Sequence, residues 1–82
     1  MSNEQMDNLL LPIFERVFRI APLQYSDALS PDTLRDWDSF GHIRLVSAME
    51  EILCVKFELV EIMDMLSVRA IKDILARRGV DG

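Results

Sequence analysis

Apolar side chains recur at helical spacing in the first quarter of the chain. The positions follow i, i+3, i+4 and i+7 steps, and they are Leu10, Ile13, Phe14, Val17 and Ala21. This pattern predicts an amphipathic helix over roughly residues 8–20. Pro12 complicates it, because proline is tolerated in a first turn but removes an interior hydrogen bond. The helix therefore either begins near Leu9 or begins earlier with a kink at Pro12.

A second helical pattern runs from Ser39 to Leu53. Asp38 or Ser39 can cap its N-terminus, because both side chains accept hydrogen bonds from free backbone N–H groups. Its expected buried stripe is Leu45, Val46, Met49, Ile52 and Leu53, with Phe40 and Ile43 towards the edge.

The C-terminal third predicts a short helix and a longer one. The segment after Cys54 is expected to be extended before a short helix over Leu59–Met63. The last helix has the best-marked ends, with Ser67 as N-cap and Gly79 as its stop. Its apolar face is Val68, Ile71, Ile74 and Leu75, and its last turn holds Arg77 and Arg78.

Residues 21–38 carry turn signals and predict a long loop, with a possible helical turn near Pro31–Leu34. Its expected anchors are Tyr25, Leu29, Leu34 and Trp37. The apolar stripes of the helices must face one another, which predicts an all-α fold, a small four-helix bundle with one short helix. We expect one domain over residues 1–82, with flexible ends at 1–7 and 79–82.

Composition and charge narrow the class of protein. The chain has 82 residues and a net charge of −5, and residues 27–64 hold nine acidic side chains against three basic ones. This acidic middle favours basic protein partners and disfavours nucleic acid. The sequence contains no run of about 18 apolar residues, so we expect no membrane span. Its first residues lack the basic and apolar pattern of a secretory signal. The single cysteine, Cys54, cannot form an internal disulfide, so we expect a cytoplasmic protein.

The stretch from Trp37 to Leu45 is the one that suggests chemistry. Ser39 begins a helix after a polar loop, and the free N–H groups of a helix N-terminus favour a phosphate or phosphodiester. Gly41 costs about 1 kcal/mol relative to alanine inside a helix, so it is useful only where a neighbour needs close approach. A phosphate arm on Ser39 would be such a neighbour. Spacing alone also allows, and favours, a plain capping serine with an incidental glycine.

The sequence Asp38-Ser39-Phe40 resembles the Asp-Ser-Leu signature of acyl and peptidyl carrier proteins. The similarity extends from about Phe14 to Leu75 and includes Ala48-Met49-Glu50-Glu51, Lys56-Phe57 and Leu66-Ser67-Val68. Trp37-Asp38-Ser39 followed by Gly41-His42 is similar to specialised bacterial carriers.

The resemblance implies a modification site and its cofactor. A phosphopantetheinyl transferase would attach 4′-phosphopantetheine from coenzyme A to Ser39, beside Asp38 and Gly41. The arm would carry an acyl or aminoacyl group as a thioester in lipid, polyketide or other specialised biosynthesis. The chain would have no catalytic residue and no metal of its own.

The resemblance also implies partners. They are an acyl- or aminoacyl-loading enzyme and a synthase or transferase with a basic docking surface, which would visit a monomer. The residues that match the family's recognition surface are Phe40, Ile43, Glu50 and Glu51.

The chain departs from the common fatty-acid carrier pattern, and other functions remain open. Arg44 and Gly41 stand where acids are frequent, Phe40 replaces the usual leucine, and Cys54 stands where a small residue, often glycine, ends the helix. Ser39 and His42 could instead form a nucleophile and base, but the Gly-x-Ser-x-Gly elbow is absent. A cofactor-free helical adaptor, using the apolar edge of Phe40 and Ile43, is the main alternative.

Overall fold

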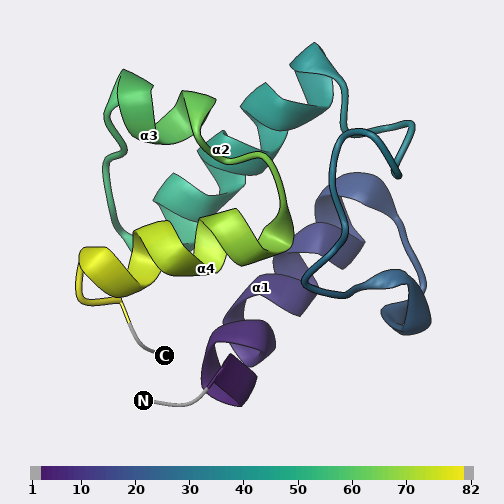
Figure 1. The fold of residues 1–82 in the computed structure, drawn as a ribbon, viewed down its shortest axis with the longest axis horizontal. Coiled ribbons are helices and arrows are strands. Elements are labelled where there is room, and N and C mark those ends of the chain that lie inside the picture. The colour runs from purple at the N-terminus through teal and green to yellow at the C-terminus, as the bar shows by residue number, and fades with distance from the viewer. Residues whose placement is uncertain (1–2, 81–82) are drawn as a thin grey trace.

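The structure is a computed structural model that describes residues 3–80, and this range contains helices and no strand. Figure 1 shows the elements in chain order: α1 (Asn3–Phe18), the 3-10 helix η1 (Pro22–Gln24), α2 (Ser39–Leu53), α3 (Leu59–Met63) and α4 (Val68–Arg77). The predicted all-helical class and the predicted bounds of the second and third helices are confirmed. None of the helices in the described range has the length and apolarity needed to cross a membrane.

Helix α1 begins earlier and ends earlier than predicted. It starts at Asn3 and runs through Pro12, so residues 3–7, expected to be part of a flexible end, form its first turns. Met6 is buried in the core, which explains why the helix extends to this end. Arg19 terminates it in the left-handed conformation, with a φ of 56°. The prediction for Ala21 is therefore wrong, because this residue lies beyond the helix and is exposed. Residues 1–2 and 81–82 of the predicted flexible ends lie outside the described range.

The core lies between α1, α2 and α4. Helix α1 packs against α2, and α4 contributes the apolar face that was predicted, while the loop anchors Leu29 and Trp37 are also buried. Ile52 is the exception, since it is 44% exposed instead of buried. It lies in the last turns of α2, at a groove that Arg16 of α1 also lines. The rest of the core is Met6, Leu10, Ile13, Phe14, Phe18, Ile20, Leu45, Val46, Met49, Phe57, Met65, Val68, Ile71, Ile74 and Leu75.

Helices α2 and α4, like α1, end in left-handed residues. Gly79, with a φ of 82°, ends α4 as predicted, and the N–H of Val80 bonds the carbonyl of Leu75 at 2.9 Å. Cys54 ends α2 in the same conformation, with a φ of 56°, and the N–H of Val55 donates to the carbonyl of Glu50 at 3.2 Å. A residue with a Cβ loses about 1–2 kcal/mol in this conformation, which explains why glycine is commoner at this position.

The long loop is fastened to α4 by backbone hydrogen bonds. The N–H groups of Val68 and Arg69 donate to the carbonyls of Leu29 and Asp27, at 2.9 and 3.1 Å. Ser67 caps the same helix end, because its hydroxyl accepts from the N–H of Ala70 at 3.0 Å. The loop therefore satisfies N–H groups that a helix N-terminus leaves free.

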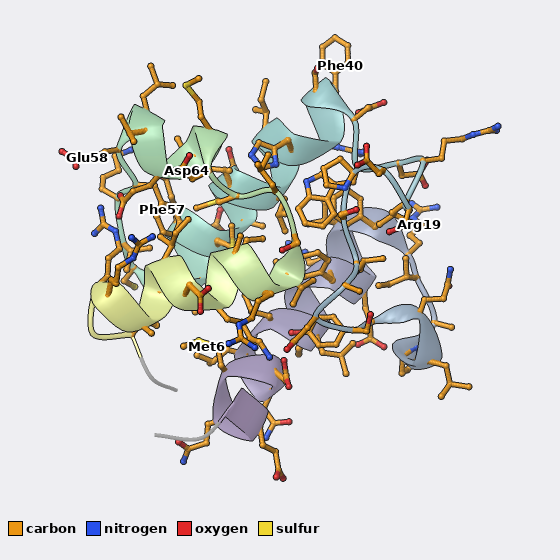
Figure 2. All side chains as sticks on the ribbon, viewed as in Figure 1. Met6, Arg19, Phe40, Phe57, Glu58 and Asp64 are labelled. Atoms are coloured by element: carbon orange, nitrogen blue, oxygen red, sulfur yellow. The ribbon has the colours of Figure 1, made fainter. Side chains whose placement is uncertain are left out.

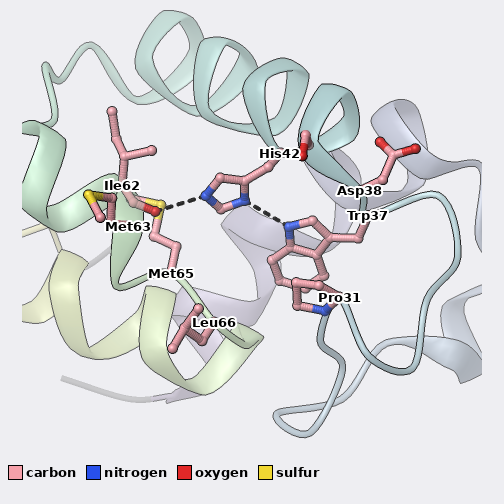
Figure 3. A pocket seen from close by; sticks show the side chains of 9 residues that line it. Pro31, Trp37, Asp38, His42, Ile62, Met63, Met65 and Leu66 are labelled. Carbon is pink, nitrogen blue, oxygen red and sulfur yellow. Dashed lines mark hydrogen bonds between the residues drawn. The ribbon is translucent and has the colours of Figure 1, made fainter.

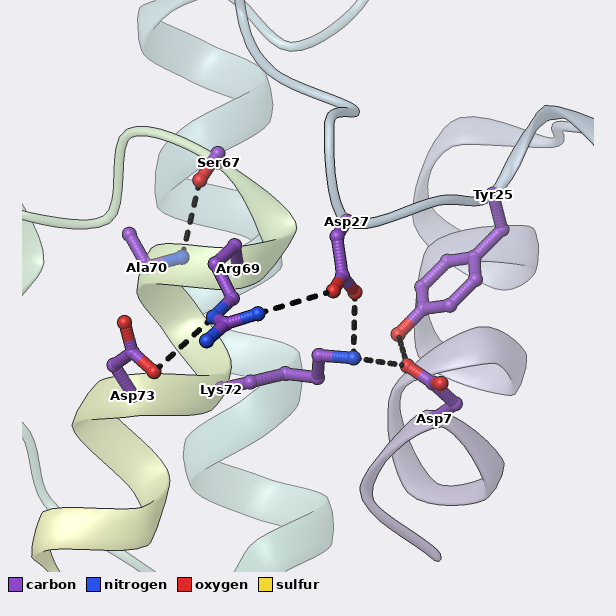
Figure 4. Close-up of polar contacts among 8 residues, drawn as sticks. All are labelled: Asp7, Tyr25, Asp27, Ser67, Arg69, Ala70, Lys72 and Asp73. Carbon is purple, nitrogen blue, oxygen red and sulfur yellow. Dashed lines mark hydrogen bonds and ion pairs between the residues drawn. The ribbon is translucent and has the colours of Figure 1, made fainter. Parts of the chain in front are cut away.

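A buried cation joins α1, the loop and α4 (Figure 4). Lys72 is 4% exposed, and its ammonium donates to Asp7 at 2.9 Å and forms an ion pair with Asp27. The hydroxyl of Tyr25 donates to the same Asp7 oxygen at 2.7 Å. Lys72 would be costly to bury alone, but here two carboxylates surround it. The sequence did not indicate this cluster, because its members lie far apart in the chain.

The cluster raises the pKa of both of its proton donors. Burial lowers the pKa of Lys72, but its hydrogen bonds to Asp27 and Asp7 outweigh burial, so the pKa of Lys72 is raised. Burial, and then the hydrogen bond to Asp7, raises the pKa of Tyr25.

We expect the protein to lose stability as the pH rises above about 10, where unfolded tyrosine and lysine side chains begin to ionise. Both groups hold their protons to higher pH in the folded state, so the folded state binds more protons than the unfolded state there. The free energy of unfolding must then fall with pH. Urea unfolding followed by circular dichroism across this range measures it. Tyr25→Phe has no phenol to ionise and should lose stability less steeply; an identical slope would show that Tyr25 is not coupled to the cluster.

Candidate functional site

The start of α2 is capped by Asp38 and not by Ser39. A carboxylate oxygen of Asp38 accepts from the N–H of Gly41 at 2.8 Å, and its carbonyl accepts from the N–H of His42 at 2.8 Å. Of the two capping residues that the sequence allowed, Asp38 takes the role. Ser39 is therefore the first residue of the helix, and capping does not occupy its side chain.

Ser39 is exposed, and its hydroxyl forms no hydrogen bond with any residue in the range 3–80. The backbone N–H groups of Ser39 and Phe40 also lack an acceptor within this range. Free N–H groups and the helix dipole make a helix N-terminus attractive to anions. The hydroxyl can therefore receive a phosphoryl group without disrupting any existing contact.

An apolar cleft of about 510 Å³ opens beside Ser39 (Figure 3). It lies between the start of α2, the preceding loop and the segment from α3 to Leu66. Its walls come from Pro31, Trp37, Asp38, Ser39, His42, Ile62, Met63, Met65 and Leu66. A chemical group attached to Ser39 would thus lie next to the apolar side chains of this cleft.

His42 links the loop to α3 across this cleft. Its Nδ1 accepts from the indole N–H of Trp37 at 2.8 Å, and its Nε2 lies 2.8 Å from the carbonyl oxygen of Ile62. Because Nδ1 accepts, the ring proton is assigned to Nε2, which donates to Ile62. The two rings are close to parallel, with centroids 6.2 Å apart and planes 19° apart, as an edge-to-edge hydrogen bond requires.

The position of His42 agrees with a helix residue beside the site and not with a base for Ser39. It is half-buried, as expected for a helix residue beside the site. Both of its ring nitrogens are engaged by Trp37 and Ile62, and none bonds Ser39 in the described range. The predicted nucleophile-and-base pairing of Ser39 and His42 is therefore not formed in this geometry. No three side chains of residues 3–80 gather into a possible metal site.

Gly41 is buried, and the neighbour that needs close approach is the protein itself. A Cβ at this position would overlap the carbonyl oxygen of Asp36 and lie 3.0 Å from the Phe18 ring. The loop backbone thus lies directly against the first turn of α2. The packing against Asp36 explains the glycine without an arm on Ser39, and Gly41 is buried.

An arginine at the end of α4 also holds helix α3 in place. The guanidinium of Arg78 makes three hydrogen bonds to the carboxylate of Glu61, at 2.7, 2.9 and 3.1 Å. It also donates to the carbonyl of Lys56 at 2.6 Å and lies 5.3 Å from the centre of the Phe57 ring. The Arg78 hydrogen bonds, and then the N–H of Glu58, lower the pKa of Glu61. These contacts fix the wall of the cleft opposite α2.

The four predicted partner-facing residues fall into two groups. Phe40 is 78% exposed and points away from the molecule in Figure 2, and Ile43 is 63% exposed. Glu51 is also exposed. Glu50 is half-buried, and its carboxylate accepts from the N–H of Phe57 at 2.9 Å, with Lys56 at 4.0 Å. Glu50 therefore holds the turn after α2 in place, a role that the sequence did not reveal.

Comparisons of the chain with protein-family models, with characterised proteins and with solved structures find no match.

We expect Gly41→Ala to destabilise the protein. Helix propensity alone would stabilise it by about 1 kcal/mol, whereas displacing the Asp36 backbone should cost more, since overpacking typically costs about 1–3 kcal/mol. Chemical unfolding gives the sign directly. Ser47→Ala, at an exposed position of the same helix, is the control and should be neutral or slightly stabilising. A stabilised Gly41→Ala variant would contradict the close approach.

We expect His42→Ala to lower the free energy of unfolding by about 1–3 kcal/mol, because it leaves the buried indole N–H of Trp37 without an acceptor. A double-mutant cycle with Trp37→Phe isolates this effect, since phenylalanine has no N–H to satisfy. In the Trp37→Phe background, His42→Ala should cost clearly less. Equal costs in both backgrounds would show that the hydrogen bond contributes nothing.

Proposed function

We propose that this chain is an acyl-carrier-type protein of the specialised bacterial kind, with an acyl-carrier-like four-helix fold. The observation that carries the proposal is the hydroxyl of Ser39, which is exposed and unpaired within residues 3–80 at the first position of α2. The side chains of Asp38 and His42 beside it form hydrogen bonds within the protein, whereas this hydroxyl forms none within residues 3–80.

The chemistry of the site fits 4′-phosphopantetheine as a covalent group. Ser39 would hold it through Oγ, as the pyrophosphate bond of coenzyme A breaks, adenosine 3′,5′-bisphosphate leaves and the transferase takes the hydroxyl proton. The free N–H groups of Ser39 and Phe40 favour the resulting phosphodiester. When bound, the group supplies a thiol that carries an acyl or aminoacyl cargo as a thioester.

The neighbouring residues keep Ser39 accessible and offer a surface to the cargo. Asp38 caps the helix, so the hydroxyl of Ser39 stays free. Gly41 lets the loop lie against the helix without covering Ser39. Met63 and Leu66, both mostly exposed at the cleft, present apolar surface on which an acyl group can rest.

The acidic charge of residues 27–64 supports basic docking surfaces on the partner enzymes. These partners would be the phosphopantetheinyl transferase, the loading enzyme and a synthase or transferase of lipid, polyketide or other specialised biosynthesis. Phe40, at the helix start and largely exposed, is the apolar side chain nearest in sequence to Ser39 for such contacts. We propose a monomer that works in the cytoplasm and has no catalytic residue of its own.

Intact mass spectrometry after incubation with coenzyme A and a broad-specificity phosphopantetheinyl transferase tests the proposal. The wild-type protein should gain the mass of one phosphopantetheinyl group. Ser39→Ala should gain none, while Ser47→Ala, which removes another exposed serine of α2, should gain it as the wild type does. A wild-type protein that stays unmodified with several competent transferases would overturn the carrier function.

A cofactor-free adaptor is the second candidate, and one observation favours it. Helix α3 and the residues after it expose apolar side chains, which are Leu59, Val60, Met63 and Leu66. Patches of this kind mark interaction sites in monomeric proteins. Absence of modification at Ser39, together with binding of a partner lost on Val60→Asp, would favour the adaptor.

A further inference from the structure

A second groove lies between α1 and α2, away from Ser39. It has a volume of about 270 Å³ and is lined by Arg16 of α1 and by side chains of α2 from Ile43 to Ile52. No residue of α2 lines both this groove and the cleft beside Ser39. The groove is thus a separate feature of the surface.

The groove exposes aliphatic side chains. Ile43 and Ile52 both line it, and Ile43 is 63% exposed. Burying such side chains against a partner would remove apolar surface from water, which is worth about 25 cal/mol per Å². A partner segment with an aliphatic side chain would therefore gain affinity here.

The cations at the groove are unpaired. Neither Arg16 nor Arg44 forms an ion pair within residues 3–80. By contrast, Lys72 and Arg78 are paired inside the fold. In a chain with a net charge of −5, these two guanidinium groups keep their full capacity for carboxylates.

From these observations we infer that the groove between α1 and α2 docks an amphipathic segment of a partner protein that places carboxylates beside aliphatic side chains. The aliphatic side chains pack on Ile43 and Ile52, and the carboxylates pair with Arg16 and Arg44. Glu51, the one acid that lines the groove, lies seven positions from Arg44 along α2 and disfavours a second carboxylate near that end. The charge requirement is opposite to that proposed for the carrier's enzyme partners, and Ile43 and Glu51 belong to both surfaces, so the two kinds of partner would compete for α2.

The inference does not rest on modification of Ser39. A display library of random 12-residue peptides, selected against the unmodified protein, supplies the probe. Enriched peptides should carry Asp or Glu next to Leu, Ile or Phe, and one of them is then synthesised with a fluorescent label. Ser39→Ala should bind this peptide as tightly as the wild-type protein, which keeps the outcome separate from that of the carrier proposal.

Fluorescence anisotropy with charge-reversed variants gives the decisive result. Arg44→Glu and Arg16→Glu should each weaken binding at least about tenfold, as expected for loss of a charge-assisted hydrogen bond. Arg77→Glu makes the same charge change at an exposed position of α4 outside the groove and should weaken binding less than about twofold. Arg44→Gln is the control for misfolding. This variant should bind the peptide more weakly while its melting temperature stays the same as that of the wild type.

Three outcomes would overturn the inference. Enriched peptides without acidic residues would show that Arg16 and Arg44 do not select carboxylates. Equal weakening by Arg44→Glu and Arg77→Glu would show a general charge effect instead of a groove. Sedimentation equilibrium that shows self-association abolished by Arg44→Glu would mean that a second copy of the chain is the occupant.

Discussion

The indole N–H of Trp37 is the constraint on which the site's architecture depends. Trp37 is 1% exposed, and its ring packs on Phe14 and Phe18 with centroids 5.4 and 5.8 Å apart. A donor this deep must find an acceptor or lose about 1–3 kcal/mol. His42 supplies the acceptor, and its second nitrogen reaches the backbone of Ile62. One buried donor thus sets the position of the loop, the first turn of α2 and α3 around Ser39.

Much of the fold could be predicted from the sequence where local signals and packing agree. Helix α4 has a serine cap, an apolar face and a glycine stop, and all three appear as predicted. The bounds of α2 and α3 also match, because cap residues and turns define helix ends through the nearest few residues. Helix α1 was predicted less well. Pro12 suggested a start near it, but burial of Met6 favours an earlier start.

The contacts that the sequence did not predict are those between distant residues. Lys72 lies far along the chain from Asp7, and nothing near either residue indicates that they meet. Glu50 was assigned to the partner-facing surface by its match to the family's recognition surface, yet its carboxylate accepts a hydrogen bond from the N–H of Phe57. For Gly41 the sequence left open an incidental glycine or a close neighbour such as an arm on Ser39, and the structure has a different close neighbour. That neighbour, the carbonyl of Asp36, depends on how the loop folds back, which helical periodicity cannot show.

These contacts change which residues at the site count as evidence for function. Asp38, Gly41 and His42 each have a structural reason to be what they are, because they cap, pack or bridge. Their presence beside Ser39 therefore adds little to the case for a carrier. Ser39 differs from them, since alanine at this position would leave every described contact intact. The fold does not use the hydroxyl of Ser39, so protein stability does not explain why a serine stands at this helix start. Its place beside free N–H groups is explained if the hydroxyl carries a covalent group.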